Sequence, residues 1–461
     1  MLFNSYGFLL VFLPLALLLH WAVVRSAPRA RVALLVVLSF VFYGYWDWRF
    51  IPLLALSIVC NWLLVEVFIE MRRGYLITLA IAVNLLVLGF FKYALFLLEL
   101  TGASLPTPAV FGLGGALPLG ISFFTFHHIM YLVDLRKGLA PRYGLAKYAL
   151  YIAFFPQVLA GPLVRWSQVM HQFDENPYLR SDAAERFAKG LLLLVLGLAK
   201  KLLGDALAEP ANAVFALAPR VSALSFADAW QGVLAFTFQI YFDFSGYTDM
   251  AIGIALMLGV VLPQNFNAPY RATSLQDFWR RWHMTLSTFL RDYLYIPLGG
   301  SRHGLQVQLL ALVITMVLGG LWHGAGLTFL AWGALHGIGL AVVVLWTRTG
   351  LALPALLGAV LTFSFVVVTW VLFRATSFAA AGILYDSMFM PASFAHVHVA
   401  ASSWLLIAAA AAIAMVGPTS WDLARGIRPT LANAGSVAAL LALSLTMLSN
   451  EHNYKFIYFQ F

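Results

Sequence analysis

The chain alternates long apolar stretches with short polar connections. Its charge-free runs span residues 1–24, 32–46, 50–65, 74–91, 100–133, 148–164, 250–270, 303–347, 349–373, 387–421 and 429–450. A transmembrane helix needs roughly 20 mainly apolar residues, so most of these runs are long enough for one crossing. The pattern predicts an all-α, polytopic membrane protein with about 10 to 12 transmembrane helices.

Two of the runs are not simple spans. The run 303–347 is long enough for two helices, and the glycines within 319–326 mark the expected break between them. The run 100–133 contains three prolines between residues 106 and 118, so we expect a loop and a broken or re-entrant segment there. Irregular backbone at membrane depth is tolerated only where protein or water covers it.

The composition supports a lipid environment. Of the 461 residues, 62% are hydrophobic and 10% are charged, whereas soluble domains average about 45–50% and 25%. The single cysteine, Cys60, excludes an intramolecular disulfide and a thiolate metal cluster. No internal repeat or linker is evident, so we treat residues 1–461 as one membrane domain, with the last span and an aromatic tail in 431–461.

The positive charge of the chain indicates an orientation rather than a nucleic-acid partner. The net charge of +9 lies mainly between the apolar runs. The arginines within 25–31 and 72–73 place these connections in the cytoplasm by the positive-inside rule, and the N-terminus outside. Arg425 and Arg428 precede the last span, so the C-terminal tail faces outward by the same rule.

Residues 239–303 hold the densest polar chemistry in the chain. Asp243 and Asp249 lie there within an apolar setting. Carboxylates inside a membrane are expensive and are functional candidates by default. The alternative is a structural role, in which the two carboxylates accept hydrogen bonds that pin helix ends.

A helix is expected over 275–296, at the membrane interface. Ser274 and Asp277 fit a capping box in which Asp replaces the usual Glu or Gln, and Pro297 ends the helical pattern. His283 falls at the edge between the apolar and polar faces, where an imidazole can meet a substrate. An interfacial histidine that only caps or bonds locally would occupy the same position.

His323 lies in a glycine-rich stretch near the middle of the run 303–347. Burial at this position would keep its imidazole neutral, which is the form that a general base needs. Glycines on both sides would let a substrate approach the backbone closely. The alternative is a helix-to-helix hydrogen bond, as expected of His336. No pair of histidines shows His-x-x-x-His spacing, so no metal site is expected.

Several motifs together resemble the membrane-bound O-acyltransferase superfamily. They occupy residues 239–249, 265–270, 278–283, 291–300 and 320–324. The most specific combination is Trp-Arg-Arg-Trp-His, ending at His283, and Trp-His-Gly around His323, forty residues later. Within the superfamily, the chain is similar to the bacterial branch that acetylates alginate and peptidoglycan.

This resemblance implies a fold with re-entrant and interfacial helices besides the spans, and a catalytic site for acyl transfer. It implies that His323 is the catalytic histidine and His283 its partner; many lipid-modifying members have Asn where His283 stands. It also implies a conduit through the membrane, which a cytoplasmic acyl donor enters from one side and a hydroxyl acceptor from the other.

The chemistry of such a transfer gives roles to further residues. His323 would deprotonate a hydroxyl that attacks a thioester carbonyl. His283, Asn267 or Tyr270 would orient that carbonyl or stabilise its oxyanion, and Trp322 would line the same site. Acetyl-CoA is the expected donor, and no bound cofactor is expected. Three arginines would hold its phosphates, unless they contact lipid headgroups or set the topology instead. They are Arg280, Arg281 and Arg291.

The aromatic C-terminal tail suggests a relay. Residues 456–461 include four aromatic side chains beyond the last span, where a free tail would be polar. The ending is similar to C-terminal motifs of envelope acylation systems, in which a tyrosine is proposed to carry the acyl group. We therefore expect the tail to reach toward His323 and Tyr458 to accept the acetyl group. The alternative is an anchor in the interfacial aromatic belt.

Together, these features predict an O-acetyltransferase of the bacterial inner membrane. It would move acetyl groups outward for O-acetylation of an envelope or secreted polysaccharide of the alginate, peptidoglycan or cellulose type. Membrane lipid, the acyl donor and a periplasmic, esterase-like acetyltransferase are the expected partners. The rival interpretations are a membrane transporter or flippase, since broken helices and buried polar groups are also transporter features, and a D-alanyl or lipid acyltransferase of the same superfamily.

Overall fold

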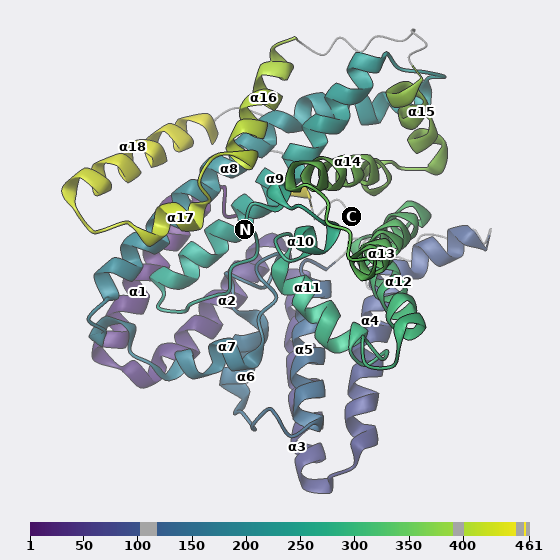
Figure 1. Ribbon diagram of the computed structural model, residues 1–461. Coiled ribbons are helices and arrows are strands. Elements are labelled where there is room, and N and C mark those ends of the chain that lie inside the picture. Colours follow the sequence, from purple (N-terminus) through teal and green to yellow (C-terminus); the bar gives the residue numbers. More distant parts are fainter. Residues whose placement is uncertain (102–117, 391–400, 449–455, 458–461) are drawn as a thin grey trace. The chain divides into compact units, whose positions relative to one another are not determined.

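The structure, a computed structural model, describes residues 1–101, 118–390, 401–448 and 456–457 (Figure 1). Within these ranges the chain forms helices joined by loops and contains no strand, as the sequence predicts. The chain divides into two compact units, each of which combines segments that are distant in sequence. Unit 1 comprises Met1–Leu196, Tyr247–Pro263 and Ala424–Leu448, and unit 2 comprises Gly197–Gly246, Gln264–Leu423 and Ser449–Phe461.

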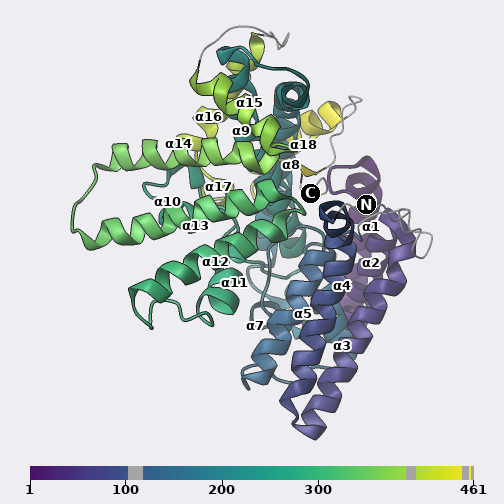
Figure 2. The same ribbon diagram turned by 90° about the vertical axis from the view of Figure 1, so that its right-hand side faces the viewer.

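Unit 1 is built mainly from the N-terminal helices. Figure 2 shows three of them, α3, α4 and α5, running side by side. The helices that lie wholly in this unit are α1 (Leu13–Ser26), α2 (Arg31–Asp47), α3 (Ile51–Met71), α4 (Gly74–Leu100), α5 (Ile121–Arg136), α6 (Leu145–Ala153), α7 (Trp166–Val169) and α18 (Leu431–Leu448).

Unit 2 contains the middle of the chain. Its helices α12 and α13 pack along each other, and α14 packs on α13 (Figure 2). The helices wholly in this unit are α10 (Leu275–Trp279), α11 (Met284–Leu290), α12 (Leu305–His323), α13 (Leu327–Arg348), α14 (Ala355–Arg374), α15 (Phe378–Phe389) and α16 (Ser402–Met415). Three helices contain residues of both units: α8 (Ala183–Leu217), α9 (Phe226–Met257) and α17 (Ser420–Arg425).

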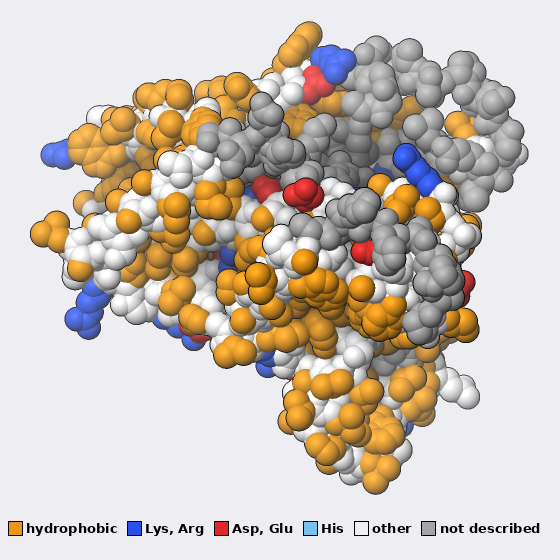
Figure 3. All heavy atoms as spheres, turned by 90° about the horizontal axis from the view of Figure 1, so that it is seen from above, with side chains coloured by type: hydrophobic (Ala, Val, Ile, Leu, Met, Phe, Trp, Pro, Cys, Tyr) orange, Lys and Arg blue, Asp and Glu red, His pale blue; other side chains and the backbone are white. Residues whose placement is uncertain are grey.

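Seven helical stretches in the described part of the chain are long and apolar enough to cross a membrane. One of them, Pro28–Met71, contains α2 and α3 in succession. Large hydrophobic side chains are widely exposed, and Figure 3 shows one face on which they are abundant. The other stretches are Gly7–Ser26, Gly74–Ala94, Leu305–His323, Leu327–Arg348, Ala355–Arg374 and Leu431–Leu448.

The two irregular apolar runs have different outcomes. The expected break in the run 303–347 is confirmed, because α12 ends at His323 and α13 begins at Leu327. The loop expected in the run 100–133 falls largely on residues 102–117, which lie outside the described residues.

A buried arginine ties the first connection to the rest of unit 1. The side chain of Arg31 is 2% exposed. Its guanidinium donates to the carbonyl oxygens of Gln172 at 2.8 Å, Glu175 at 2.7 Å and Leu258 at 2.9 Å. Besides any role in orientation, Arg31 therefore holds together three segments of this unit through main-chain acceptors.

The adjacent histidines of α5 are structural in this unit. His128 Nδ1 lies 2.6 Å from the hydroxyl of Tyr148, and His127 Nε2 accepts a hydrogen bond from the backbone N–H of Val164 at 3.2 Å. Both side chains are fully buried. They join α5 to α6 and to the loop that follows it.

Helices α8 and α9 approach each other closely through glycines. A Cβ added at Gly204 would lie 2.8 Å from the backbone N of Asp243, and one added at Gly246 would lie 2.9 Å from the backbone N of Lys201. Small residues let helix backbones come together in this way. The close approach brings the side chains of Lys201 and Asp243 into contact.

We expect Gly204→Ala to lower the free energy of unfolding by about 1–3 kcal/mol, because the added methyl group meets backbone atoms that cannot turn away. The thermal midpoint of the detergent-solubilised protein measures this. Gly382→Ala in α15 is the matched control, since a Cβ there meets no atom within 4 Å. Equal midpoints for the two variants would contradict the tight helix contact.

Candidate active site

His323 occupies the C-terminal end of α12, where glycines set its position. A Cβ at Gly320 would lie 2.3 Å from the carbonyl oxygen of Phe329, and one at Gly324 would lie 2.2 Å from the ring of Phe329. The glycines that the sequence offered for substrate approach are thus used for packing: they let the end of α12 come against the start of α13.

Aromatic rings surround the imidazole of His323. Its ring centroid lies 4.9 Å from that of Trp322, 5.3 Å from Trp332 and 5.2 Å from Phe373. The side chain is only 4% exposed. The Nε1–H of Trp332 has no hydrogen-bond partner among the described residues. Buried N–H groups are rarely left unpaired, so this donor is available to a substrate oxygen.

His283 is held in an unusual backbone conformation at a break between two helices. Its φ of +42° lies in the left-handed region, which non-glycine residues seldom adopt. The single helix expected over 275–296 is therefore wrong: α10 ends at Trp279, α11 begins at Met284, and a π-helical turn follows over Arg291–Tyr295. The predicted cap is present, with Ser274 Oγ accepting from Asp277 N at 3.1 Å.

Asn265 is the physical reason for the break. Its Oδ1 accepts hydrogen bonds from the backbone N–H of Thr285 at 3.1 Å and from the hydroxyl of Thr285 at 2.8 Å. The same oxygen lies 3.2 Å from Nδ1 of His283. A side chain distant in sequence thus binds the first turn of α11 and fixes the residue that precedes it. Asn265 is fully buried, and our sequence analysis did not single it out.

These contacts also determine the tautomer of His283. Because Asn265 Oδ1 accepts a bond from a backbone N–H, it is an acceptor, and Nδ1 of His283 must carry the proton. Complete burial lowers the pKa of His283 to about 3, so the ring is neutral. Its Nε2 then presents a lone pair, and it has no hydrogen-bond partner among the described residues.

The two histidines meet around one indole. The ring centroid of Trp322 lies 6.3 Å from that of His283 and 4.9 Å from that of His323. On its other side, His283 packs edge-on against Phe244 at 4.8 Å. The structure therefore brings together His283, Trp322 and His323, the three residues on which the sequence motifs converge.

The other residues proposed for carbonyl orientation lie elsewhere. The hydroxyl of Tyr270 donates to the carbonyl oxygen of Thr237 at 2.5 Å, which joins it to α9. Asn267 is exposed, and Arg281 pairs with Asp277 at 2.9 Å. His336 bridges helices as expected: Trp279 Nε1 donates to its Nδ1, and its Nε2 lies 3.0 Å from Thr369 Oγ1.

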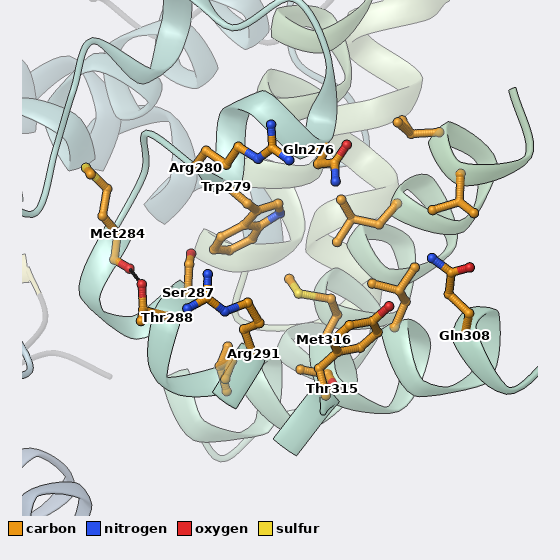
Figure 4. A pocket seen from close by; sticks show the side chains of 16 residues that line it. Gln276, Trp279, Arg280, Met284, Ser287, Thr288, Arg291, Gln308, Thr315 and Met316 are labelled. Carbon is orange, nitrogen blue, oxygen red and sulfur yellow. Dashed lines mark hydrogen bonds between the residues drawn. The ribbon is translucent and has the colours of Figure 1, made fainter. Parts of the chain in front are cut away.

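A cavity of about 460 Å³ lies beside this site (Figure 4). Arg280 and Arg291 line it, together with Trp279 and polar side chains of α11 and α12. The hydroxyl of Thr315, 5% exposed, has no hydrogen-bond partner among the described residues. The cavity also borders Met284, which follows His283 directly. It thus combines apolar walls with two cationic side chains.

A buried ion cluster includes Asp243, which directly precedes Phe244 on α9. Lys201 Nζ lies 2.7 Å from Asp243 Oδ1 and also pairs with Asp205. Burial raises the pKa of Asp205 to about 7, although Lys201 opposes this shift. Burial disfavours the Lys201 ammonium, but Asp243 and Asp205 outweigh it, and the pKa of Lys201 is raised. We did not identify Lys201 and Asp205 from the sequence, although their i, i+4 spacing in an apolar segment was a signal.

The C-terminal tail contributes two described residues to the same region. Phe456 and Ile457 are each 2% exposed, and the Phe456 ring lies 5.8 Å from that of Phe244. The backbone N–H of Ile457 donates to Asp243 Oδ2 at 2.8 Å. Tyr458, the expected acyl carrier, lies outside the described residues. Asp249, the other carboxylate that the sequence offers as a candidate, is buried on α9.

The described residues contain no group of three or more His, Cys, Asp or Glu side chains that could hold a metal ion. Apolar helical stretches and two buried histidines are features of a polytopic membrane enzyme. A model of the membrane-bound O-acyltransferase family matches residues 40–385, and the chain belongs to this family. The predicted family, the helical membrane fold and the multi-pass character are thereby confirmed.

Relatives with similar sequences carry related names. The chain is 40% identical over 411 residues to the probable alginate O-acetylase AlgI of Pseudomonas aeruginosa, covering 84% of this chain and 75% of that protein. It is 39% identical over 421 residues to the peptidoglycan O-acetyltransferase of Helicobacter pylori, covering 83% and 78%. Similarity to the teichoic acid D-alanyltransferase of Streptococcus thermophilus is lower, 27% over 242 residues, covering 50% and 57%. The prediction of an enzyme, an O-acetyltransferase, is confirmed.

The raised pKa of Asp205 predicts a pH-dependent stability. A carboxyl with a higher pKa in the folded chain stabilises the fold fully below its ordinary pKa of 3.8, and this stabilisation is lost as the pH rises through about 7. Asp205→Asn removes this carboxyl, so we expect the stability of the variant to fall less than that of wild type between pH 5 and pH 8. Thermal midpoints of both proteins at the two pH values measure this. An equal fall in the two proteins would contradict the raised pKa.

Proposed function

We propose that this protein transfers acetyl groups from acetyl-CoA, taken up on the cytoplasmic side of the bacterial inner membrane, to an acceptor on the periplasmic side. The single observation that carries this proposal is the pair of buried imidazoles, His283 and His323, that share contact with Trp322. The final acceptor is an envelope or secreted polysaccharide, as the names of the alginate and peptidoglycan O-acetyltransferase relatives suggest.

In this mechanism His323 is the general base. It takes the proton of an acceptor hydroxyl while the hydroxyl oxygen attacks the thioester carbonyl carbon. When the tetrahedral intermediate collapses, the C–S bond breaks and the imidazolium returns the proton to the leaving thiolate. A neutral imidazole in apolar surroundings suits this cycle, because both its uncharged and charged forms are needed in turn.

The tautomer of His283 favours an acceptor role for its Nε2. Since Nδ1 carries the proton toward Asn265, Nε2 cannot donate to an oxyanion while the ring is neutral. His283 therefore binds the acceptor hydroxyl and helps to align it. The oxyanion would need an N–H donor, and Trp332 Nε1–H, beside His323, is the candidate.

The cavity in Figure 4 is the proposed donor site. Its apolar walls suit a pantetheine arm, and Arg280 and Arg291 carry the positive charge that phosphates require. Arg281 pairs with Asp277 and Arg291 pairs with Asp292, so Arg280 is the one of the three arginines that we propose holds a phosphate directly.

The tail completes the proposed route. Tyr458 follows Ile457 directly, and we propose that its hydroxyl accepts the acetyl group before a periplasmic, esterase-like acetyltransferase receives it. The buried positions of Phe456 and Ile457, next to Phe244, support a tail that reaches the histidine site rather than a free anchor. The N-terminus and the tail would both lie on the periplasmic side.

Transfer of isotope-labelled acetyl from acetyl-CoA to the purified protein tests the base. We expect His323→Gln to lower thioester cleavage by about 10²–10⁴-fold, since general base catalysis contributes this much. His303→Gln, at an exposed loop position, is the matched control and should retain activity. Undiminished cleavage by His323→Gln would remove His323 from the mechanism. A protein that ignores acetyl-CoA but accepts a carrier-bound D-alanyl thioester would support the D-alanyl rival, and one that cleaves neither would support the transporter.

Peptide mapping of the labelled protein tests the relay separately. We expect label on the C-terminal peptide of wild type and none on that of Tyr458→Phe, because the substitution removes only the hydroxyl. Acetyl delivery to the periplasmic partner should fall with it. A Tyr458→Phe protein that still delivers acetyl groups at the full rate would refute the relay while leaving the role of His323 intact.

A further inference from the structure

The C-terminal tail is bound through its main chain. The N–H of Ile457 donates to Asp243 Oδ2 at 2.8 Å, in a fully buried contact. The neighbouring Phe456 packs on Phe244, whose ring also packs on His283. A main-chain hydrogen bond fixes the register of the tail whatever its side chains are.

The acceptor of that bond depends on a second charge. The two carboxylate oxygens of Asp243 have different partners. Oδ2 accepts the hydrogen bond from Ile457, and Oδ1 lies 2.7 Å from Lys201 Nζ. The side chains of Asp243 and Lys201 are 3% and 1% exposed. A buried carboxylate is stable only when it is paired and hydrogen-bonded. The ammonium of Lys201 and the N–H of Ile457 are the two partners that Asp243 has among the described residues, one at each oxygen.

Asp205 is a second carboxylate partner of Lys201. It is four residues from Lys201 on α8 and pairs with it. Lys201 therefore has a carboxylate partner that does not depend on Asp243. If the tail left, Asp243 Oδ2 would lose its hydrogen bond from the N–H of Ile457. Release of the tail therefore costs the free energy of one buried hydrogen bond.

We propose that Lys201, Asp205 and Asp243 form a latch that seats the C-terminal tail beside His283. Asp243 binds the tail, and Lys201 and Asp205 are positioning residues that act through Asp243. The latch is distinct from the catalytic pair, His283 and His323. It rests on the proposed function only in the statement that the bound tail carries an acetyl group.

Thiol accessibility measures the latch directly in the full-length protein. The parent for this test carries Cys60→Ser, which removes the only native cysteine, and Ile457→Cys, which keeps the main-chain N–H. Reaction of a buried thiol with a water-soluble maleimide requires release of the tail, so its rate reports the released fraction. No acyl donor is needed, so the readout is independent of catalysis.

We expect Asp243→Ala to raise the labelling rate by roughly 10- to 100-fold, the effect of losing a hydrogen bond to a charged acceptor. Lys201 still has Asp205 in this variant, so the fold is retained. Asp243→Asn keeps an acceptor oxygen and should label about three- to tenfold more slowly than Asp243→Ala. Ser245→Ala is the matched control, a fully buried polar residue of the same helix, and should label like the parent.

The role of Lys201 is tested by a conservative rescue. Lys201→Met should raise the labelling rate several-fold, whereas Lys201→Arg, which keeps a cation, should restore slow labelling. Equal rates for Met and Arg would reduce Lys201 to a packing role and overturn its part in the latch. An unchanged rate in Asp243→Ala would overturn the latch as a whole. Faster labelling in Asp243→Ala, combined with full acetyl delivery by Tyr458→Phe, would support the latch and refute only the relay.

Discussion

The desolvation of polar groups is the constraint on which this structure depends. Only 10% of the residues are charged and the interior is mainly apolar, so a buried polar group is stable only with a partner in the protein or in a bound substrate. Arg31 donates to four main-chain carbonyls, and Lys201 pairs with two carboxylates. Such contacts act over short distances. They are possible only where helices come close together, as α8 and α9 do at Gly204 and Gly246.

The features that could be read from the sequence are those with a local cause. The helix break between His323 and Leu327 follows from a cluster of glycines, and the cap at Ser274 follows from its own side chain. Burial of the tail at Phe456 follows from its aromatic composition. Each of these is decided within a few neighbouring residues, where spacing and residue type carry the information.

The features that escaped prediction have distant causes. The apolar periodicity of 275–296 predicts one helix, but Asn265, from an earlier segment, takes up the hydrogen-bonding groups of Thr285 and interrupts it. Lys201 lies 42 positions before Asp243, and periodicity along either helix cannot pair them. In the same way, the glycines near His323 suggest space for a substrate, yet α13 occupies the space beside Gly320 and Gly324.

The left-handed backbone at His283 restricts which residues can occupy that position. Among residues with a Cβ, Asn, Asp and His are the ones enriched in this conformation. The resemblance to the superfamily implies Asn at this position in many lipid-modifying members. The two residues differ in acid–base chemistry but share a tolerance for the same φ. The main chain thus limits this position to a short list of side chains, and the acid–base chemistry of the site depends on which of them is present.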